Sequence, residues 1–230
     1  MIAFFLVSGL FLGWSLGANH AANVIGTAVA SKMVRFRTAA VLCSVFVVLG
    51  SVRGGTGTTA TLGRLGRVDA MGGAFMVTLA AALAVYWMTK LKLPVSTSQA
   101  IIGSILGWNL FAGAATDLQA LARIVLSWGA AIVLAAALSA VLYMLCRAGL
   151  RRSRIHLLRL DAYTRAGLVA VAAFGSYSLG ANNIANVMGV FVPVTPFRDV
   201  AVGNLFTLTG VQQLFLLGGI AIAVGVFTYS

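Results

Sequence analysis

Uncharged, mostly apolar stretches alternate with short charged segments along the whole chain. With histidine counted as neutral, seven stretches carry no charge: 1–31, 38–52, 70–89, 93–116, 124–146, 166–197 and 200–230. A helix needs about 20 predominantly apolar residues to cross a bilayer, and most of these stretches reach that length. The stretch 38–52 is shorter and would have to extend at either end. The pattern predicts an all-α fold, a polytopic bundle of transmembrane helices.

The composition excludes most soluble functions. Hydrophobic residues make up 60% of the 230 residues and charged residues 9%, whereas a soluble domain has about 25% charged residues. The acidic residues are four Asp and no Glu, which leaves little from which to build a two-carboxylate hydrolase or a carboxylate metal site. The apolar stretches hold no nucleophile with its base and no metal-binding cluster. We therefore predict neither an enzyme nor an organic cofactor.

The basic residues lie between the apolar stretches and give a formal net charge of +12. The largest group runs from Arg147 to Arg165. Short loops rich in Lys and Arg are typical of the cytoplasmic side of a membrane protein, and contact with anionic lipid headgroups is compatible with this. We predict a multi-pass protein of the cell membrane, the inner membrane if the source is bacterial. Its predicted partner is the lipid bilayer and not nucleic acid.

One polar motif occurs twice in the chain. Residues 11–30 read FLGWSLGANHAANVIGTAVA and residues 174–193 read FGSYSLGANNIANVMGVFVP, at a constant offset of 163 residues with 11 of 20 positions identical. Each copy places two Asn four residues apart inside an apolar stretch, on one helix face if the helix continues. Interhelical hydrogen bonding with close Gly packing would explain such a motif. Duplicated polar breaks are also typical of the substrate and ion sites of repeat-built transporters.

A second polar feature is the segment Leu93–Gly107, LPVSTSQAIIGSILG. Pro94 favours the start of a helix, and Ser96, Thr97 and Ser98 are typical first-turn or capping residues. A helix N-terminus offers free N–H groups and a partial positive charge, so the three hydroxyls could complete an anion site without any charged side chain. An ordinary helix cap at the membrane interface explains the spacing equally well.

Together these motifs resemble the inorganic phosphate transporter family, the phosphate/sulfate permeases. The matching residues are Gly17–Asn23 with Gly26 and Thr27, Gly180–Asn183 with Asn186 and Gly189, and Pro94–Gln99. The resemblance implies inverted repeats, a Ser/Thr-rich re-entrant or broken helix, and cation-coupled symport of phosphate. It implies substrate binding by Ser96, Thr97, Ser98, Gln99, Asn19 and Asn182. It assigns ion coupling to His20, Asn23, Thr27, Asn183 and Asn186.

The chain departs from the family pattern where the coupling ion would bind. His20 and Asn183 stand where the family motifs have Asp, and Gln99 stands where the family has His. A sodium site would then have to use neutral oxygens, for example those of Asn19, Asn23, Asn182 and Asn186. Histidine titrates near neutral pH, so His20 makes a proton the alternative coupling ion.

The offset of the repeat predicts the organisation of the chain. We expect a first transmembrane repeat at 1–147, a basic cytoplasmic linker at 148–165, and the start of a second repeat at 166–230. A second copy of Ser96 would fall near residue 259, after Ser230, so the second repeat is expected to be incomplete. The open alternatives are a non-transporting membrane scaffold or partner subunit that keeps the fold, and a sulfate permease. A homodimer is left open as an assembly.

Overall fold

The computed structural model describes residues 2–229 except 58, 60–64, 66–67, 69, 154, 196 and 203–205. Its helices are α1 (Ile2–Ala30), α2 (Phe36–Gly54), α4 (Met71–Lys90), α5 (Thr97–Ala112), α6 (Leu118–Arg152), α7 (Leu157–Met188) and α8 (Gly210–Tyr229). A short 3-10 helix, η1 (Gly189–Val194), follows α7 directly. Six helices are long and apolar enough to cross a membrane among the residues described, and α5 is not one of them. The predicted all-α membrane bundle is confirmed.

Two segments differ from the sequence-based expectation. The stretch 200–230 begins with an antiparallel pair of short strands, β1 (Val200–Val202) and β2 (Phe206–Leu208), before α8 starts. The basic linker expected at 148–165 is mostly helical, because α6 continues to Arg152 and α7 starts at Leu157. Arg154, within that linker, lies outside the described residues. The connection between the two long helices is therefore much shorter than the charge pattern suggests.

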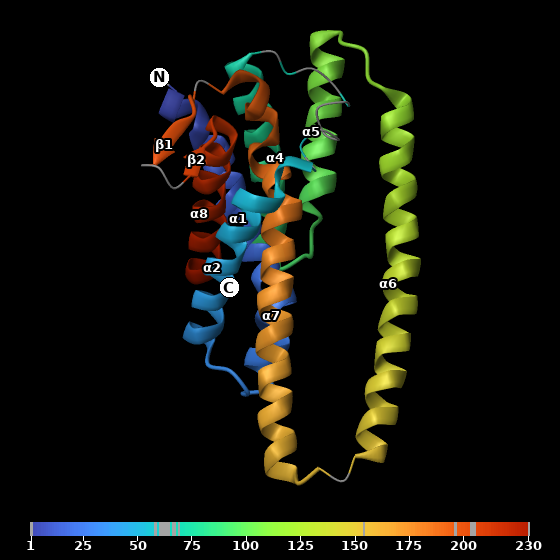
Figure 1. Ribbon diagram of the computed structural model, residues 1–230. Coiled ribbons are helices and arrows are strands. Elements are labelled where there is room, and N and C mark those ends of the chain that lie inside the picture. The colour runs from blue at the N-terminus through green and yellow to red at the C-terminus, as the bar shows by residue number, and fades with distance from the viewer. Residues whose placement is uncertain are drawn as a thin grey trace.

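The two helices that carry the duplicated motif run in opposite directions. In Figure 1, α1 descends from the N-terminus at the top, whereas α7 rises from the bottom. The two helices also contact each other. Inverted repeats predict this antiparallel arrangement, because an odd number of crossings separates corresponding elements.

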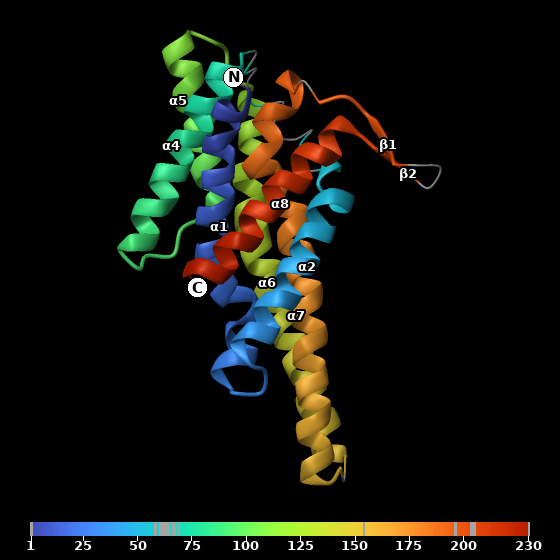
Figure 2. The ribbon, with the colours of Figure 1, turned by 90° about the vertical axis from the view of Figure 1, so that its left-hand side faces the viewer.

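Helices α4 and α5 form a hairpin that is shorter than the long helices beside it. Figure 2 shows its turn nearer the middle of the molecule than the turns that follow α1 and α6. Lys92 has a φ of 58°, and the Leu93 N–H donates to the Met88 carbonyl at 3.0 Å. A residue with left-handed backbone angles, spanned by a hydrogen bond of this kind, ends a helix abruptly. The chain therefore turns back sharply and starts α5 inside the bundle.

Close approach of backbones holds the bundle together at two crossings, between α2 and α7 and between α1 and α8. At both, glycines lie against backbone carbonyls: Gly17 against Ile222, Gly225 against Trp14, Gly180 against Val47 and Gly50 against Tyr177. Gly17 and Gly180 are the matching glycines of the two motif copies. Each motif glycine thus packs its helix against another helix, as small residues do in membrane bundles.

Helix α6 takes almost no part in the core. None of its residues is buried, and only a few near its start, such as Leu121, Ile124 and Trp128, are partly buried against the core. In Figure 1 it stands apart from the other helices. Its apolar side chains are therefore exposed along most of the helix.

Candidate functional site

The first turn of α5 lies between the two copies of the duplicated motif. The Thr97 hydroxyl lies 3.3 Å from Nε2 of His20 on α1. The Asn186 amide on α7 donates to the Ser98 hydroxyl at 2.8 Å. Thr97 and Asn186 are both buried. Two consecutive residues of α5 are thereby joined to the two helices that run antiparallel on either side.

Ser96 has a different role from its two neighbours. It is the N-cap of α5, and its side-chain oxygen accepts a hydrogen bond from the Gln99 N–H at 3.3 Å. Its carbonyl accepts from the Ala100 N–H at 3.0 Å. The N–H groups of Thr97 and Ser98 come first in the helix, where no earlier carbonyl of the helix can accept from them. The capping explanation therefore fits Ser96. The backbone N–H groups that have no acceptor within the helix are those of Thr97 and Ser98.

A further hydrogen bond ties the hairpin to the first motif copy. The Asn19 amide donates to the Thr89 hydroxyl at 3.0 Å, and this hydroxyl donates to the Val85 carbonyl at 2.7 Å within α4. The sequence analysis did not single out Thr89. Its only signal is a hydroxyl at the end of an apolar stretch, which is common in membrane helices. Asn19 therefore fixes the end of α4 against α1.

In the second motif copy, the amides form a short chain. Asn186 donates both to Ser98 and, at 3.1 Å, to the side-chain oxygen of Asn183. The Asn183 amide in turn donates to the Leu179 carbonyl at 3.1 Å. These bonds point the Asn186 amide toward α5. Asn183, at the position where the family motif has Asp, holds Asn186 in place.

Four predicted site residues are exposed, namely Asn23, Thr27, Gln99 and Asn182. The Asn182 amide donates to Ser178 of its own helix at 3.1 Å. The predicted sodium site made of Asn19, Asn23, Asn182 and Asn186 stays a prediction.

The residues that do meet at α5 are neutral hydrogen-bonding groups, apart from the titratable His20. Hydroxyl and backbone N–H donors at a helix N-terminus suit an anion. Among the residues that the structure describes, no three or more His, Cys, Asp or Glu lie together as a metal site would need. We call Thr97, Ser98, His20 and Asn186 the α5 cluster.

Comparison with known proteins adds independent information. The sequence model of the phosphate transporter family matches residues 16–163. A Methanocaldococcus jannaschii protein, provisionally named a phosphate permease, is 27% identical over 226 residues, which are 98% of this chain and 66% of that protein. The mouse sodium-dependent phosphate transporter 1 is 29% identical over 221 residues, which are 91% of this chain and 29% of that protein. The chain therefore spans less than two thirds of the length of these relatives.

A solved structure has a similar fold. It is the structure of a sodium-dependent phosphate transporter, and the TM-score is 0.78 at 22% sequence identity. The match covers 99% of this chain and 75% of the other. At this identity the likeness concerns the arrangement of the helices and not the chemistry of the site.

Proposed function

Since the chain belongs to the phosphate transporter family, we propose that it acts in secondary transport of inorganic phosphate by symport with a cation. The observation that carries the proposal is the position of the first turn of α5. Thr97 and Ser98 meet the two motif copies through His20 and Asn186. A ligand held at this turn would be in reach of both antiparallel motif helices, which alternating access requires of a binding site.

The proposed substrate is a tetrahedral oxyanion bound by donors that carry no full charge. The N–H groups of Thr97 and Ser98 would bind one face of the anion, and their hydroxyls would turn to donate as well. Donors to an anion form stronger hydrogen bonds than donors to a neutral group. The names of the relatives support phosphate over sulfate.

We also propose that the functional halves are 1–147 and 166–230, joined by 148–165. The repeated motif at residues 11–30 and 174–193 supports this division. So does the packing of Gly17 and Gly180, one from each half, at separate helix crossings.

Uptake of labelled phosphate into liposomes tests the proposed function. We expect purified protein to carry phosphate inward when an imposed inward cation gradient drives it. This activity should remain in excess sulfate. Uptake blocked equally by sulfate would indicate a general oxyanion permease. A protein that neither takes up phosphate nor is stabilised by it against heating would be a scaffold, and the proposal would be wrong.

We expect the transport to depend on external pH through His20. In the tautomer with its proton on Nδ1, a neutral imidazole accepts from the Thr97 hydroxyl at Nε2. Protonation makes Nε2 a donor, which frees the Thr97 hydrogen to donate to the anion. His20→Asn should therefore abolish the pH dependence of labelled phosphate uptake.

His156 provides the matched control, since it is the other histidine of the chain and caps the start of α7. His156→Asn should keep the pH dependence. The names of two relatives state sodium dependence, so uptake is also measured under a sodium gradient at fixed pH. If it follows sodium and ignores pH in all three proteins, a sodium site outside the α5 cluster provides the coupling.

A further inference from the structure

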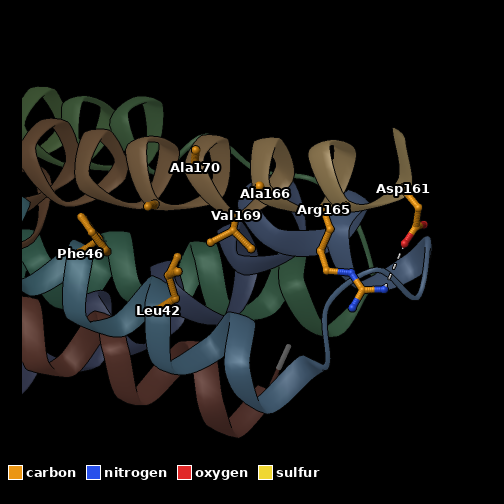
Figure 3. Close-up of a pocket in the computed structure, with 9 residues that line it drawn as sticks. Leu42, Phe46, Asp161, Arg165, Ala166, Val169 and Ala170 are labelled. Atoms are coloured by element: carbon orange, nitrogen blue, oxygen red, sulfur yellow. Dashed lines mark hydrogen bonds and ion pairs between the residues drawn. The ribbon is translucent and has the colours of Figure 1, made fainter. Parts of the chain in front are cut away.

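A groove lies between the N-terminal halves of α2 and α7. Its volume is about 660 Å³, and most of its lining is apolar, with Leu42 and Phe46 from α2 and Ala166, Val169 and Ala170 from α7. Figure 3 shows Val169 of α7 pointing toward Leu42 of α2. The small Ala side chains of α7 leave the space that a larger residue would fill.

One end of the groove is charged. Arg165 lines it there, and its guanidinium lies 3.4 Å from the Asp161 carboxylate, one turn earlier on α7. Figure 3 shows this ion pair at the opposite end from Phe46. Both side chains are about half exposed, and exposed pairs of this kind are weak. A competing anion could therefore take the place of the Asp161 carboxylate at little cost.

The charged end of the groove lies at the strongly basic end of the bundle. Figure 1 places the connections after α1 and after α6 at the same lower end. The basic residues there, among those described, are Lys32, Arg35, Arg37, Arg147, Arg151, Arg152, Arg159 and Arg165. Asp161 is the acidic residue among these segments. Any ligand that lies in the groove thus meets an excess of positive charge at one end.

We propose that this groove binds one phospholipid with a net negative headgroup. An acyl chain lies along the apolar lining between α2 and α7, and the headgroup phosphate accepts hydrogen bonds from Arg165. Basic pockets between membrane helices recognise anionic headgroups in this way. The occupant is a membrane lipid and not free phosphate, because the apolar length of the groove offers nothing to a small anion. The site is separate from the α5 cluster, so it does not depend on the proposed transport.

Lipid binding to the full chain in detergent tests the proposal. The probes are phosphatidylglycerol and phosphatidylcholine with identical acyl chains, and bound lipid is counted by native mass spectrometry. We expect one phosphatidylglycerol to bind more tightly than phosphatidylcholine. Arg165→Gln should weaken its binding roughly fivefold, the effect of one basic residue near an anionic surface. Ala170→Phe should fill the groove and weaken the binding of both lipids.

Two matched substitutions separate the groove from general attraction. Arg159→Gln removes an equal charge from the same helix, and Val171→Phe adds bulk at the next, exposed position of α7. Neither residue lines the groove, so Val171→Phe should bind phosphatidylglycerol as the unchanged protein does, and Arg159→Gln should lose much less affinity than Arg165→Gln. The proposal is overturned if the two Arg variants lose affinity equally, if Ala170→Phe binds normally, or if inorganic phosphate displaces the lipid. Unchanged melting temperatures without lipid show that each variant is folded.

Discussion

Replacing Thr97 by Val and Ser98 by Ala should each weaken phosphate binding about tenfold or more. A hydrogen bond to a charged group contributes roughly 1.5–3 kcal/mol, and a tenfold change in affinity corresponds to about 1.4 kcal/mol. Thr97 is buried, so water cannot replace its lost hydroxyl easily. The double variant should bind phosphate about a hundredfold more weakly if the two hydroxyls act independently. The measurement is isothermal titration of purified protein with inorganic phosphate in detergent.

Ser104 on the same helix serves as the control. Its hydroxyl donates to the Ala100 carbonyl within α5 at 2.9 Å, so Ser104→Ala removes a hydroxyl without touching the α5 cluster. Thr97→Ser keeps a hydroxyl at the key position and should retain most of the affinity. If phosphate binds the double variant and the Ser104→Ala protein equally well, the anion does not bind at the start of α5.

The second large effect is expected at the glycine crossings. A Cβ atom on Gly180 would collide with the backbone carbonyl of Val47, and one on Gly50 would collide with that of Tyr177. Since backbone cannot move aside as a side chain can, α2 and α7 must separate. We expect Gly180→Ala and Gly50→Ala each to destabilise the protein by about 1–3 kcal/mol, the typical cost of overpacking. The melting temperature in detergent would show the loss.

Gly103 and Gly107 on α5 allow a direct comparison, because a Cβ at either position meets nothing within 4 Å. Their replacement by Ala should leave the melting temperature unchanged or raise it, since Ala favours a helix more than Gly does. The combined Gly50→Ala and Gly180→Ala variant should lose less stability than the sum of the losses in the two single variants. Both residues widen the same crossing, and neighbouring sites are not additive. Equal melting temperatures for Gly180→Ala and Gly103→Ala would contradict the packing role.

The fold was accessible from the sequence because charges are costly in lipid. Each charge-free stretch contains most of one helix, and 70–89 matches α4 (Met71–Lys90) almost residue for residue. The charge pattern could not reveal the small strands before α8, because the segment 200–209 is as free of charge as the helix that follows. Nor could it show how far the α4–α5 hairpin enters the bundle. That depth depends on the left-handed turn at Lys92 and on contacts with other helices.

The candidate site was accessible only in part. The duplicated motif identified α1 and α7, and the hydroxyl triplet identified α5. Which residues of each motif face inward was not accessible, because α1 is apolar on all sides and gives no preferred face. Asn19 meets Thr89 in the last turn of α4. Asn23 lies one turn further along α1, close to where α4 ends, and is exposed. Two Asn on one helix face therefore have different surroundings.

The isolation of α6 has a consequence for how the protein is made. No residue of α6 is buried against another helix. We therefore expect α6 to enter the bilayer during synthesis by its own transfer free energy, before any partner helix can stabilise it. Because Lys and Arg are enriched in cytoplasmic loops, we expect Arg151 and Arg152 at its end to remain on the cytoplasmic side. The direction in which α6 inserts then dictates the direction of α7, and with it the orientation of the second motif copy. Over evolution, α6 should therefore exchange Leu, Ile and Val freely while rejecting a central charge, which would cost about 2.5–3.5 kcal/mol on insertion.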